Sequence, residues 1–314
     1  MQFWPRKRAR REYPRVRSWT SKIESAKPLG FAAYKVGMTH VSIIDNKKTS
    51  MTKGQEIVCP VTILECPPLK VAGIRLYKTD VYGKKPSKDI LTKADKELGR
   101  KISLPKKTKE SELGPIKPEE YSDIMLLVYT QPKLTGFGKK RPELFELGIG
   151  SNDMKQKFDY AKSIVGKEIK VNDVFQEGHQ VDVHAITKGK GYQGPVKRFG
   201  VSIRSHKAEK TKRGPGSLGA WKAQAHIMYR VAHAGQMGYQ TRTEFNKHIL
   251  KIDSDFSKVN KKGGFKHYGL IKNPYMLLRG SVIGPSKRMV RLSTATRESK
   301  TIPKEAPTLQ FITS

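Results

Sequence analysis

Cysteines, acidic residues and long apolar runs are scarce in this chain of 314 residues. The two cysteines, Cys59 and Cys66, cannot complete a zinc site, and we expect both to be reduced core thiols of a cytosolic protein. The alternative is a disulfide between them. The longest apolar run, residues 124–129, falls well short of the ~20 residues of a transmembrane helix. No apolar segment follows the basic N-terminus and no basic amphipathic helix is evident, so we predict neither a signal peptide nor membrane contact.

Catalytic sequence patterns are also missing. No G-x-x-x-x-G-K-[ST] loop occurs, Ser217 does not stand in the G-x-S-x-G pattern of a nucleophile elbow, and the histidines show no H-E-x-x-H spacing. Most acidic residues lie in the middle of the chain, where lysines can pair with them, and no carboxylate dyad is indicated. We therefore predict a protein that is not an enzyme and that needs no cofactor, metal ion or small-molecule substrate.

Positive charge dominates what is present. The chain has 62 Lys and Arg against 28 Asp and Glu, a net charge of +34, and a pI near 10.1. A compact domain with this charge would repel itself, so we expect a polyanionic partner, and with membranes excluded that partner is nucleic acid. A merely soluble, supercharged surface is the alternative. Residues 80–180 carry 20 basic and 16 acidic residues, which leaves +30 of the +34 in the flanking segments.

Residues 1–30 form a basic arm with interleaved aromatic residues, and Pro5 and Pro14 interrupt any helix there. Such a segment cannot bury a core, so we expect it to be disordered in isolation and ordered by wrapping a phosphate backbone. A disordered tail without a fixed partner is the alternative. The candidate RNA contacts of the arm are Arg6, Lys7, Arg8, Arg10, Arg11, Arg15 and Arg17.

Short runs rich in β-branched residues, punctuated by Gly and Pro, predict strands on both sides of a near-neutral insertion. We expect a bend or bulge at Gly37. In the insertion, the patterns predict a helix from Ser87 to Gly99, and another that starts after Asn152 or Asp153 and ends at Gly166. The expected strands are 41–44, 57–64, 71–77, 124–130, 171–175, 181–187, 248–252, 275–282 and 289–293. This pattern favours a mostly β fold, one discontinuous barrel or sandwich with an α+β insertion.

The glycines Gly189, Gly191 and Gly194 form the pattern G-x-G-x-x-G after an expected strand, which is half of a dinucleotide-binding fingerprint. The other half is absent, because Pro195 and a basic run replace the apolar helix and no ribose-binding acid follows. We infer that these glycines let backbone amides approach phosphates. Charge for the phosphates would come from Lys188, Lys190, Lys197 and Arg198.

From Lys188 to Lys247 the chain has 13 basic residues, two acidic residues, nine glycines and two prolines. This composition predicts extended loops that a partner orders, and we take the stretch as the main RNA-binding surface. Trp221 either returns to the core or stacks on a base. The further candidate contacts are Arg204, His206, Lys207, Lys210, Lys212, Arg213, Trp221, Lys222, Arg230, Arg242 and Lys247.

Residues 175–198 resemble the signature of the large-subunit ribosomal protein L3 family. The matching positions are Phe175, Asp182, Ala185, Thr187, Gly189, Lys190, Gly191, Gly194 and Arg198. Residues 29–40, 219–221 and 234–247 are also similar to stretches of that family, and the chain looks like its archaeal form. The similarity covers most of the chain and is weakest in the insertion and at the last residues.

The resemblance implies a six-stranded Greek-key barrel of the translation-protein type. It also implies primary binding to rRNA near the 3′ end of 23S rRNA, a part in nucleating subunit assembly, and a finger near the peptidyl transferase centre. Trp221 would be the finger tip, with Lys210, Lys212 and Arg213 on its flank. Eukaryotic members have a methylatable histidine at the position of Lys212, so that modification is not expected. The neighbours would be ribosomal protein L14 and the eukaryote-type L24.

The resulting division has a basic extension at 1–30, barrel segments at 31–79, 171–200 and 241–314, the α+β insertion at 80–170, and the finger at 201–240. An RNA-modifying enzyme and a non-ribosomal packaging protein with basic arms are the alternative functions.

Overall fold

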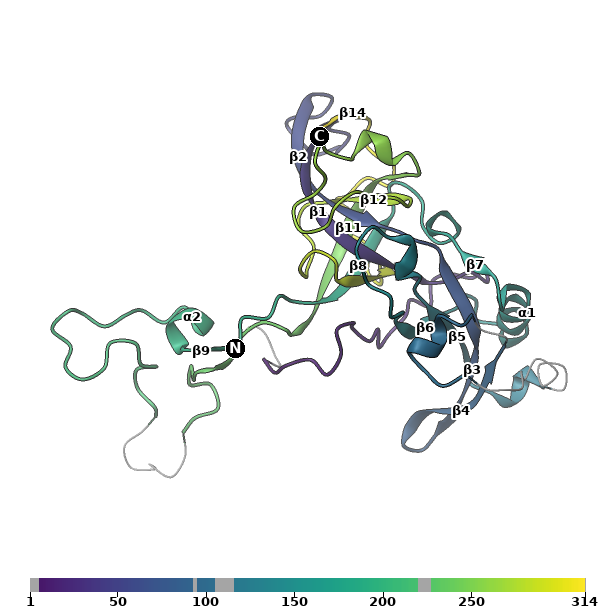
Figure 1. The fold of residues 1–314 in the computed structure, drawn as a ribbon, viewed down its shortest axis with the longest axis horizontal. Helices are drawn as coiled ribbons and strands as arrows, with labels where there is room; N and C mark the ends of the chain where they lie inside the picture. The colour runs from purple at the N-terminus through teal and green to yellow at the C-terminus, as the bar shows by residue number, and fades with distance from the viewer. Residues whose placement is uncertain (1–5, 93–94, 105–115, 220–226, 314) are drawn as a thin grey trace. The chain divides into compact units, whose positions relative to one another are not determined.

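The computed structural model describes residues 6–92, 95–104, 116–219 and 227–313, and strands predominate over helices in it (Figure 1). The chain divides into two compact units. Unit 1 consists of Met1–Glu12 and Ile186–Arg242, and unit 2 of Tyr13–Ala185 and Thr243–Ser314. The hydrophobic core of the chain lies in unit 2. The fold is therefore mostly β, with several sheets, as predicted.

The largest sheet has seven strands in the order β13-β8-β11-β12-β2-β1-β14. The first strand in this order, β13, also pairs with β1, so all of these strands except β14 close into a ring. The ring combines β1 and β2, which precede the insertion, with β8, β11, β12 and β13, which follow it, so one sheet is built from discontinuous segments as predicted. Its strands are β1 (Gly30–Ile44), β2 (Glu56–Glu65), β8 (Gln180–Ile186), β11 (Thr241–Asp253), β12 (Tyr275–Arg279), β13 (Met289–Thr294) and β14 (Leu309–Ile312).

The long strand β1 carries the irregularity predicted at Gly37. Lys35 pairs with Leu64 of β2 but Gly37 pairs with Ile63, so one residue of β1 is extra. A bulge of this kind bends a strand and lets it take part in a strongly curved sheet. The prediction of a bulge is confirmed.

The insertion and the strand β3, which lies in the predicted barrel segment 31–79, form a second sheet, with the order β4-β3-β5-β6 and β7 paired with β3. The helix α1 (Met154–Ile164) follows it and buries Phe158 and Ala161. The Asp153 side chain accepts a hydrogen bond from the Lys155 amide at 3.0 Å, so the predicted cap is confirmed. The strands are β3 (Leu69–Asp80), β4 (Gly83–Leu91), β5 (Asp123–Tyr129), β6 (Leu144–Gly148) and β7 (Glu168–Ile169).

The helix predicted from Ser87 to Gly99 is wrong. Residues up to Leu91 belong to β4, where Ile90 pairs with Ile74 of β3 and is fully buried. Cross-strand pairing of this kind overrides a helical spacing of apolar residues. The 3-10 turn η1 (Leu98–Arg100) follows.

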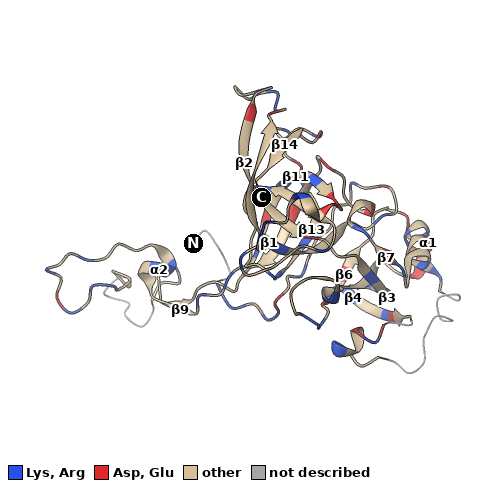
Figure 2. Ribbon diagram, turned by 45° about the horizontal axis from the view of Figure 1, so that its top comes forward, with Lys and Arg blue, Asp and Glu red and all other residues tan. Residues whose placement is uncertain are grey.

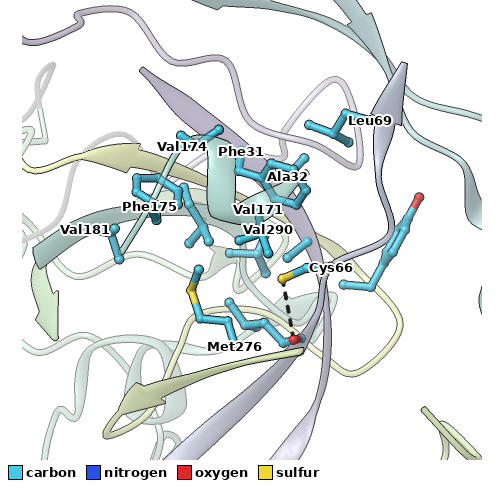
Figure 3. Packing of buried hydrophobic residues seen from close by; sticks show 14 of the residues in the cluster. Phe31, Ala32, Cys66, Leu69, Val171, Val174, Phe175, Val181, Met276 and Val290 are labelled. Atoms are coloured by element: carbon cyan, nitrogen blue, oxygen red, sulfur yellow. Dashed lines mark hydrogen bonds between the residues drawn. The ribbon is translucent and has the colours of Figure 1, made fainter. Parts of the chain in front are cut away.

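The strand predicted at 171–175 is also wrong. Residues Val171–Asp173 form the 3-10 turn η5, in which the Asp173 carboxylate accepts a hydrogen bond from the Lys170 amide at 2.8 Å. Asparagine and aspartate stabilise turns through such local bonds. Val171, Val174 and Phe175 are all buried, which is the spacing of a helical turn (Figure 3). Other 3-10 turns among the described residues are η3 (Pro118–Glu120), η4 (Pro132–Leu134) and η7 (Phe256–Lys258).

The two cysteines lie within unit 2 as free, buried thiols, which confirms the prediction. Cys66 packs among the buried apolar residues shown in Figure 3, and its thiol donates to the Leu64 carbonyl at 3.7 Å. Burial raises the pKa of the Cys66 thiol well above its ordinary value, so this thiol stays protonated and unreactive.

Unit 1 has little regular structure in its described part. It contains the short helix α2 (Pro195–Phe199) and a two-stranded ladder of β9 (Tyr192–Gln193) and β10 (Gly235–Gln236). Apart from the ends of β8 and β11, at Ile186 and at Thr241 and Arg242, the rest of its described residues form loops, as the composition predicted. In the part of the chain that the structure describes, no helix has the length and apolar character needed to span a bilayer.

Candidate nucleic-acid interface

The glycine-rich stretch and the returning segment of unit 1 form a backbone ladder. The Lys190 amide donates to the Met237 carbonyl at 2.9 Å, and the Met237 amide donates to the Gly191 carbonyl at 2.8 Å. The two legs approach so closely at Gly238, where φ is +71°, that an added Cβ would lie 2.0 Å from the Lys188 carbonyl oxygen. The structure thus brings together two stretches that the sequence analysis had treated one by one.

The glycines assigned to phosphate approach lie on the surface. Gly189, Gly191 and Gly194 are exposed, and a Cβ at Gly191 or Gly194 would meet nothing within 4 Å. Open backbone of this kind leaves room for a phosphate group near the amides. Their binding of phosphate stays a prediction.

A short basic helix follows the glycines. Pro195 is the first residue of α2, and Gly200, with φ of +71°, ends the helix by donating its amide to the Val196 carbonyl. The sequence pattern had indicated no apolar helix here, and α2 is indeed short and carries Lys197 and Arg198 in its last turn.

Arg198 is half-buried and donates hydrogen bonds to three backbone carbonyls. Its Nη1 donates to His233 at 2.8 Å, its Nε to Gln236 at 3.1 Å, and its Nη2 to Arg6 at 3.4 Å. Partial burial and the nearby Arg6 guanidinium lower the pKa of Arg198 from its ordinary value. A guanidinium is well suited to this task because it presents several donors in a fixed plane. Arg198 therefore holds α2, the returning segment and the N-terminal segment together.

The N-terminal segment joins unit 1 through residues 6–12. The Ala9 amide donates to the Tyr239 carbonyl at 2.8 Å, and the Arg8 guanidinium lies 5.6 Å from the centroid of the Tyr239 ring. Arg6 donates from Nη1 to the Arg198 carbonyl at 2.8 Å and lies 4.2 Å from the Phe199 ring. The exposed cations of this segment are Lys7, Arg8, Arg10 and Arg11.

Residues 13–30 of the basic arm belong to unit 2, and their packing differs from the disorder that the sequence predicted. Pro14 and Val16 are buried while Arg15 and Arg17 are exposed. The Pro14 carbonyl accepts a hydrogen bond from Arg291 at 3.3 Å, and the Leu29 amide donates to the Gly148 carbonyl at 2.9 Å. The expectation that RNA alone orders residues 13–30 is wrong, because these residues pack on protein.

Cations are distributed along the loops of unit 1 (Figure 2), and most of those in its described part are exposed. The Arg204 amide donates to the Lys212 carbonyl at 3.1 Å, so the loop between them folds back with cations on both legs. Trp221 and Lys222 lie outside the described residues. The exposed candidates are Lys188, Lys190, Lys197, Arg204, His206, Lys207, Lys210, Lys212, Arg213 and Arg230.

Two further candidates are engaged with neighbouring protein groups. Arg242 of unit 1 donates to the Gln240 side-chain oxygen at 2.8 Å and to the Thr241 carbonyl. Lys247 of unit 2 pairs with Glu244 at 3.2 Å. Both side chains are half-buried, so their charge is less available than that of the loop lysines.

A set of exposed apolar side chains, which was not among the residues predicted from the sequence, lies among these cations. Tyr192 is 78% exposed and Tyr229 is 86% exposed, and Ile203 and Met228 are about half exposed. Aromatic and apolar groups held in water beside cations suit packing against nucleotide bases. Their signal in the sequence is single apolar residues inside glycine-rich, basic loops.

Among the residues with a described placement, no three His, Cys, Asp or Glu side chains gather in a way that could hold a metal ion. The interface as built offers cations, open backbone and exposed aromatic rings.

Comparisons with known proteins agree with this chemistry. The family described as Ribosomal protein L3 matches residues 1–313. A protein of Methanosphaera stadtmanae named large ribosomal subunit protein uL3 is 48% identical over 99% of this chain and 94% of its own length. Proteins of the same name from Methanosphaerula palustris and Methanothermobacter thermautotrophicus are each 44% identical over 99% of this chain, and cover 95% and 94% of their own lengths.

Proposed function

Because this chain belongs to the ribosomal protein L3 family, it is a structural constituent of the large ribosomal subunit and not an enzyme, and we propose that unit 1 is its main contact with rRNA. The observation that carries this proposal is the surface of unit 1. Its exposed cations stand on glycine-rich loops, and the residues of the core lie in unit 2. Loops with this charge gain stability from the phosphates that they neutralise.

The finer part of the proposal rests on the family resemblance. The protein binds near the 3′ end of 23S rRNA, helps to nucleate assembly of the subunit, and supports the peptidyl transferase centre through residues 201–240. Trp221 is the proposed tip of this finger, with the exposed Lys210, Lys212 and Arg213 on its flank. The ring of strands in unit 2 is proposed to be the Greek-key barrel of the family, with the insertion at 80–170 attached to it.

The proposed partners follow from the same resemblance. Besides rRNA, they are neighbouring ribosomal proteins, among them L14 and the eukaryote-type L24, in the cytoplasmic ribosome. The relatives compared above are archaeal, so the bound rRNA would be of the 23S type.

Sedimentation of ribosomal subunits in a high-salt sucrose gradient tests this function. We expect the protein to remain with the large subunit, and its presence only at the top of the gradient would refute the proposal. The role of the finger needs a separate test. Trp221→Ala should leave the melting temperature of the free protein unchanged and slow peptidyl transfer by reconstituted subunits, whereas a large loss of thermal stability would place Trp221 in the core.

A further inference from the structure

Unit 2 carries a second group of exposed cations, on a loop that the sequence analysis did not single out. The loop, residues 259–273, contains Lys261, Lys262, Lys266, His267 and Lys272 and no acidic residue. The sequence has no Asp or Glu from Phe256 to Arg297. Lys262, Lys266, His267 and Lys272 are exposed.

The loop is anchored by apolar side chains. Val259, Phe265, Tyr268 and Ile271 are buried in the core of unit 2. The Asn260 side chain donates to the Ile271 carbonyl at 3.0 Å and accepts from the Ile271 amide at 2.9 Å, so it clamps the two ends of the loop. The exposed lysines therefore alternate with residues whose positions are fixed.

A buried carboxylate fastens the end of the loop from inside. Glu65 is fully buried and accepts hydrogen bonds from the Lys272 amide at 3.0 Å, from the Asn273 amide at 3.1 Å and from the Tyr268 hydroxyl. Burial and the charge of Glu65 raise the pKa of Tyr268, which keeps its hydroxyl a donor. The acidic group thus faces inward and the lysines face water.

The neighbouring loop, residues 131–141, adds to the same surface. The rings of Phe137 and Tyr268 meet edge to face at 5.2 Å, and the Asn273 side chain donates to the Leu134 carbonyl at 3.1 Å. The loops touch so closely that a Cβ on Gly136 would lie 2.8 Å from the Leu270 carbonyl oxygen. Lys140 and Arg141 on this loop are exposed.

The backbone of the long loop offers donors as well. Gly263, Gly264 and His267 adopt positive φ, and the Phe265 amide donates to the Gly269 carbonyl at 2.9 Å. Among the described residues, no backbone carbonyl accepts from the amides of Gly263 and His267. Amides and ammonium groups on one fixed loop are suited to a phosphate backbone.

We propose that the loops 131–141 and 259–273 form a second RNA-binding surface, which unit 2 holds ready before RNA binds. This inference rests on the proposed function, since it takes the RNA partner from there. This second surface differs from that of unit 1, because buried side chains fix the loops that carry its lysines. The cations of unit 1 lie on loops outside the hydrophobic core. The ligand class is the phosphate backbone of folded large-subunit rRNA.

The test measures rRNA affinity of the full-length protein as a function of salt. Changing Lys262, Lys266 and Lys272 to Ala removes three exposed charges, and changing Lys47, Lys48 and Lys53 to Ala in the β1–β2 turn is the matched control. In the first variant only, the plot of log K against log salt should become shallower by about 0.7 to 0.9 for each phosphate that the protein no longer neutralises. If the first variant keeps the native slope, or if both variants change equally, the proposal is refuted. The native slope is also expected if the surface binds an acidic protein instead of RNA.

Lysine acetylation of the native protein gives a direct readout. Lys262, Lys266 and Lys272 should be acetylated in the free protein and protected in the rRNA complex, while Lys48 should react in both. Full reactivity of the three lysines in the complex would refute the proposed binding surface. If the native protein fails to bind rRNA at all, the proposed function fails; if it binds through unit 1 alone, only this inference fails.

Discussion

Arg6 and Arg198 each donate a hydrogen bond to the backbone carbonyl of the other. Arg6 Nη1 lies 2.8 Å from the Arg198 carbonyl oxygen, and Arg198 Nη2 lies 3.4 Å from that of Arg6. The exchange joins residues 192 positions apart in the sequence and places both guanidinium groups near the Phe199 ring, at 4.2 Å and 5.0 Å from its centroid. Hydrogen bonds to carbonyl oxygens offset part of the repulsion between the two positive charges. A nearby phosphate would offset more of this repulsion.

Replacing Arg198 by Ala should destabilise the contacts that hold the segments of unit 1 together. The variant lacks the donors to the carbonyls of His233, Gln236 and Arg6, and we expect local opening to become easier by about 1 to 3 kcal/mol. Hydrogen exchange at the Lys190 and Met237 amides should accelerate about tenfold or more. The matched control is Lys197→Ala, which removes the exposed cation next to it and should weaken rRNA binding without changing exchange. Equal exchange rates in the two variants would contradict the bracing role.

Gly238 and Gly194 should respond differently to substitution by Ala. At Gly238 the backbone has positive φ and a Cβ would collide with the Lys188 carbonyl, so Gly238→Ala should open the β9–β10 ladder at a cost above about 2 kcal/mol. At Gly194 φ is −71° and the space is open, so Gly194→Ala should cost less than about 0.5 kcal/mol. Protection of the Met237 amide from hydrogen exchange measures the opening of the ladder in both variants. Protection unchanged by Gly238→Ala would disprove the close approach.

Stability should fall in mildly acidic solution because of two histidines. Burial, with Arg291 for His184 and Arg279 for His248, lowers the pKa of each to about 4, whereas an unfolded histidine has a pKa near 6.5. The unfolded chain therefore binds more protons between about pH 6.5 and pH 4. The stabilisation by neutral histidines is complete above pH 6.5 and is lost as the pH falls to 4.

The loss should be about 1 to 3 kcal/mol for each histidine, after allowance for residual solvent contact. The melting temperature recorded from pH 7 to pH 4.5 measures it. Changing His184 and His248 to Gln should flatten the profile in this window, whatever the stability of the variant at pH 7. A profile as steep as that of the native chain would show that other groups cause the pH dependence.

Glu65→Gln should destabilise unit 2 although Glu65 contacts no solvent. The carboxylate accepts bonds from Tyr268, Lys272 and Asn273, and a neutral amide replaces one acceptor oxygen by a donor. We expect a loss of about 1 to 3 kcal/mol in the free energy of urea-induced unfolding. Glu56→Gln, at an exposed site, is the control and should change it by less than about 0.5 kcal/mol. Equal unfolding midpoints would argue against the inward carboxylate as the anchor of loop 259–273.

The sequence predicted elements whose cause is local. The cap at Asp153, the bulge at Gly37 and the buried thiol of Cys66 each follow from the residue and its near neighbours. The helix predicted at residues 87–99 failed because a distant segment decides its structure. Ile90 has helical spacing with Leu98, but its pairing with Ile74 places it in a strand.

The candidate interface shows the same division. Composition alone pointed to the cations of unit 1, and the structure exposes most of them. It could not separate Lys197, which faces water, from Arg198, which binds three carbonyls, because the partners of Arg198 lie far away in the sequence. The sequence did not indicate loop 259–273, because residues such as Glu65, about 200 residues earlier, hold the loop and its lysines in place.

Ultraviolet cross-linking of intact large subunits, followed by mass spectrometry of the protein, tests the central claim most directly. If unit 1 is the main contact with rRNA, nucleotides should be attached to peptides from residues 186–219 and 227–242, with Tyr192 and Tyr229 among the modified side chains. Subunits that yield cross-linked peptides from elsewhere in the chain and none from residues 186–242 would contradict the account.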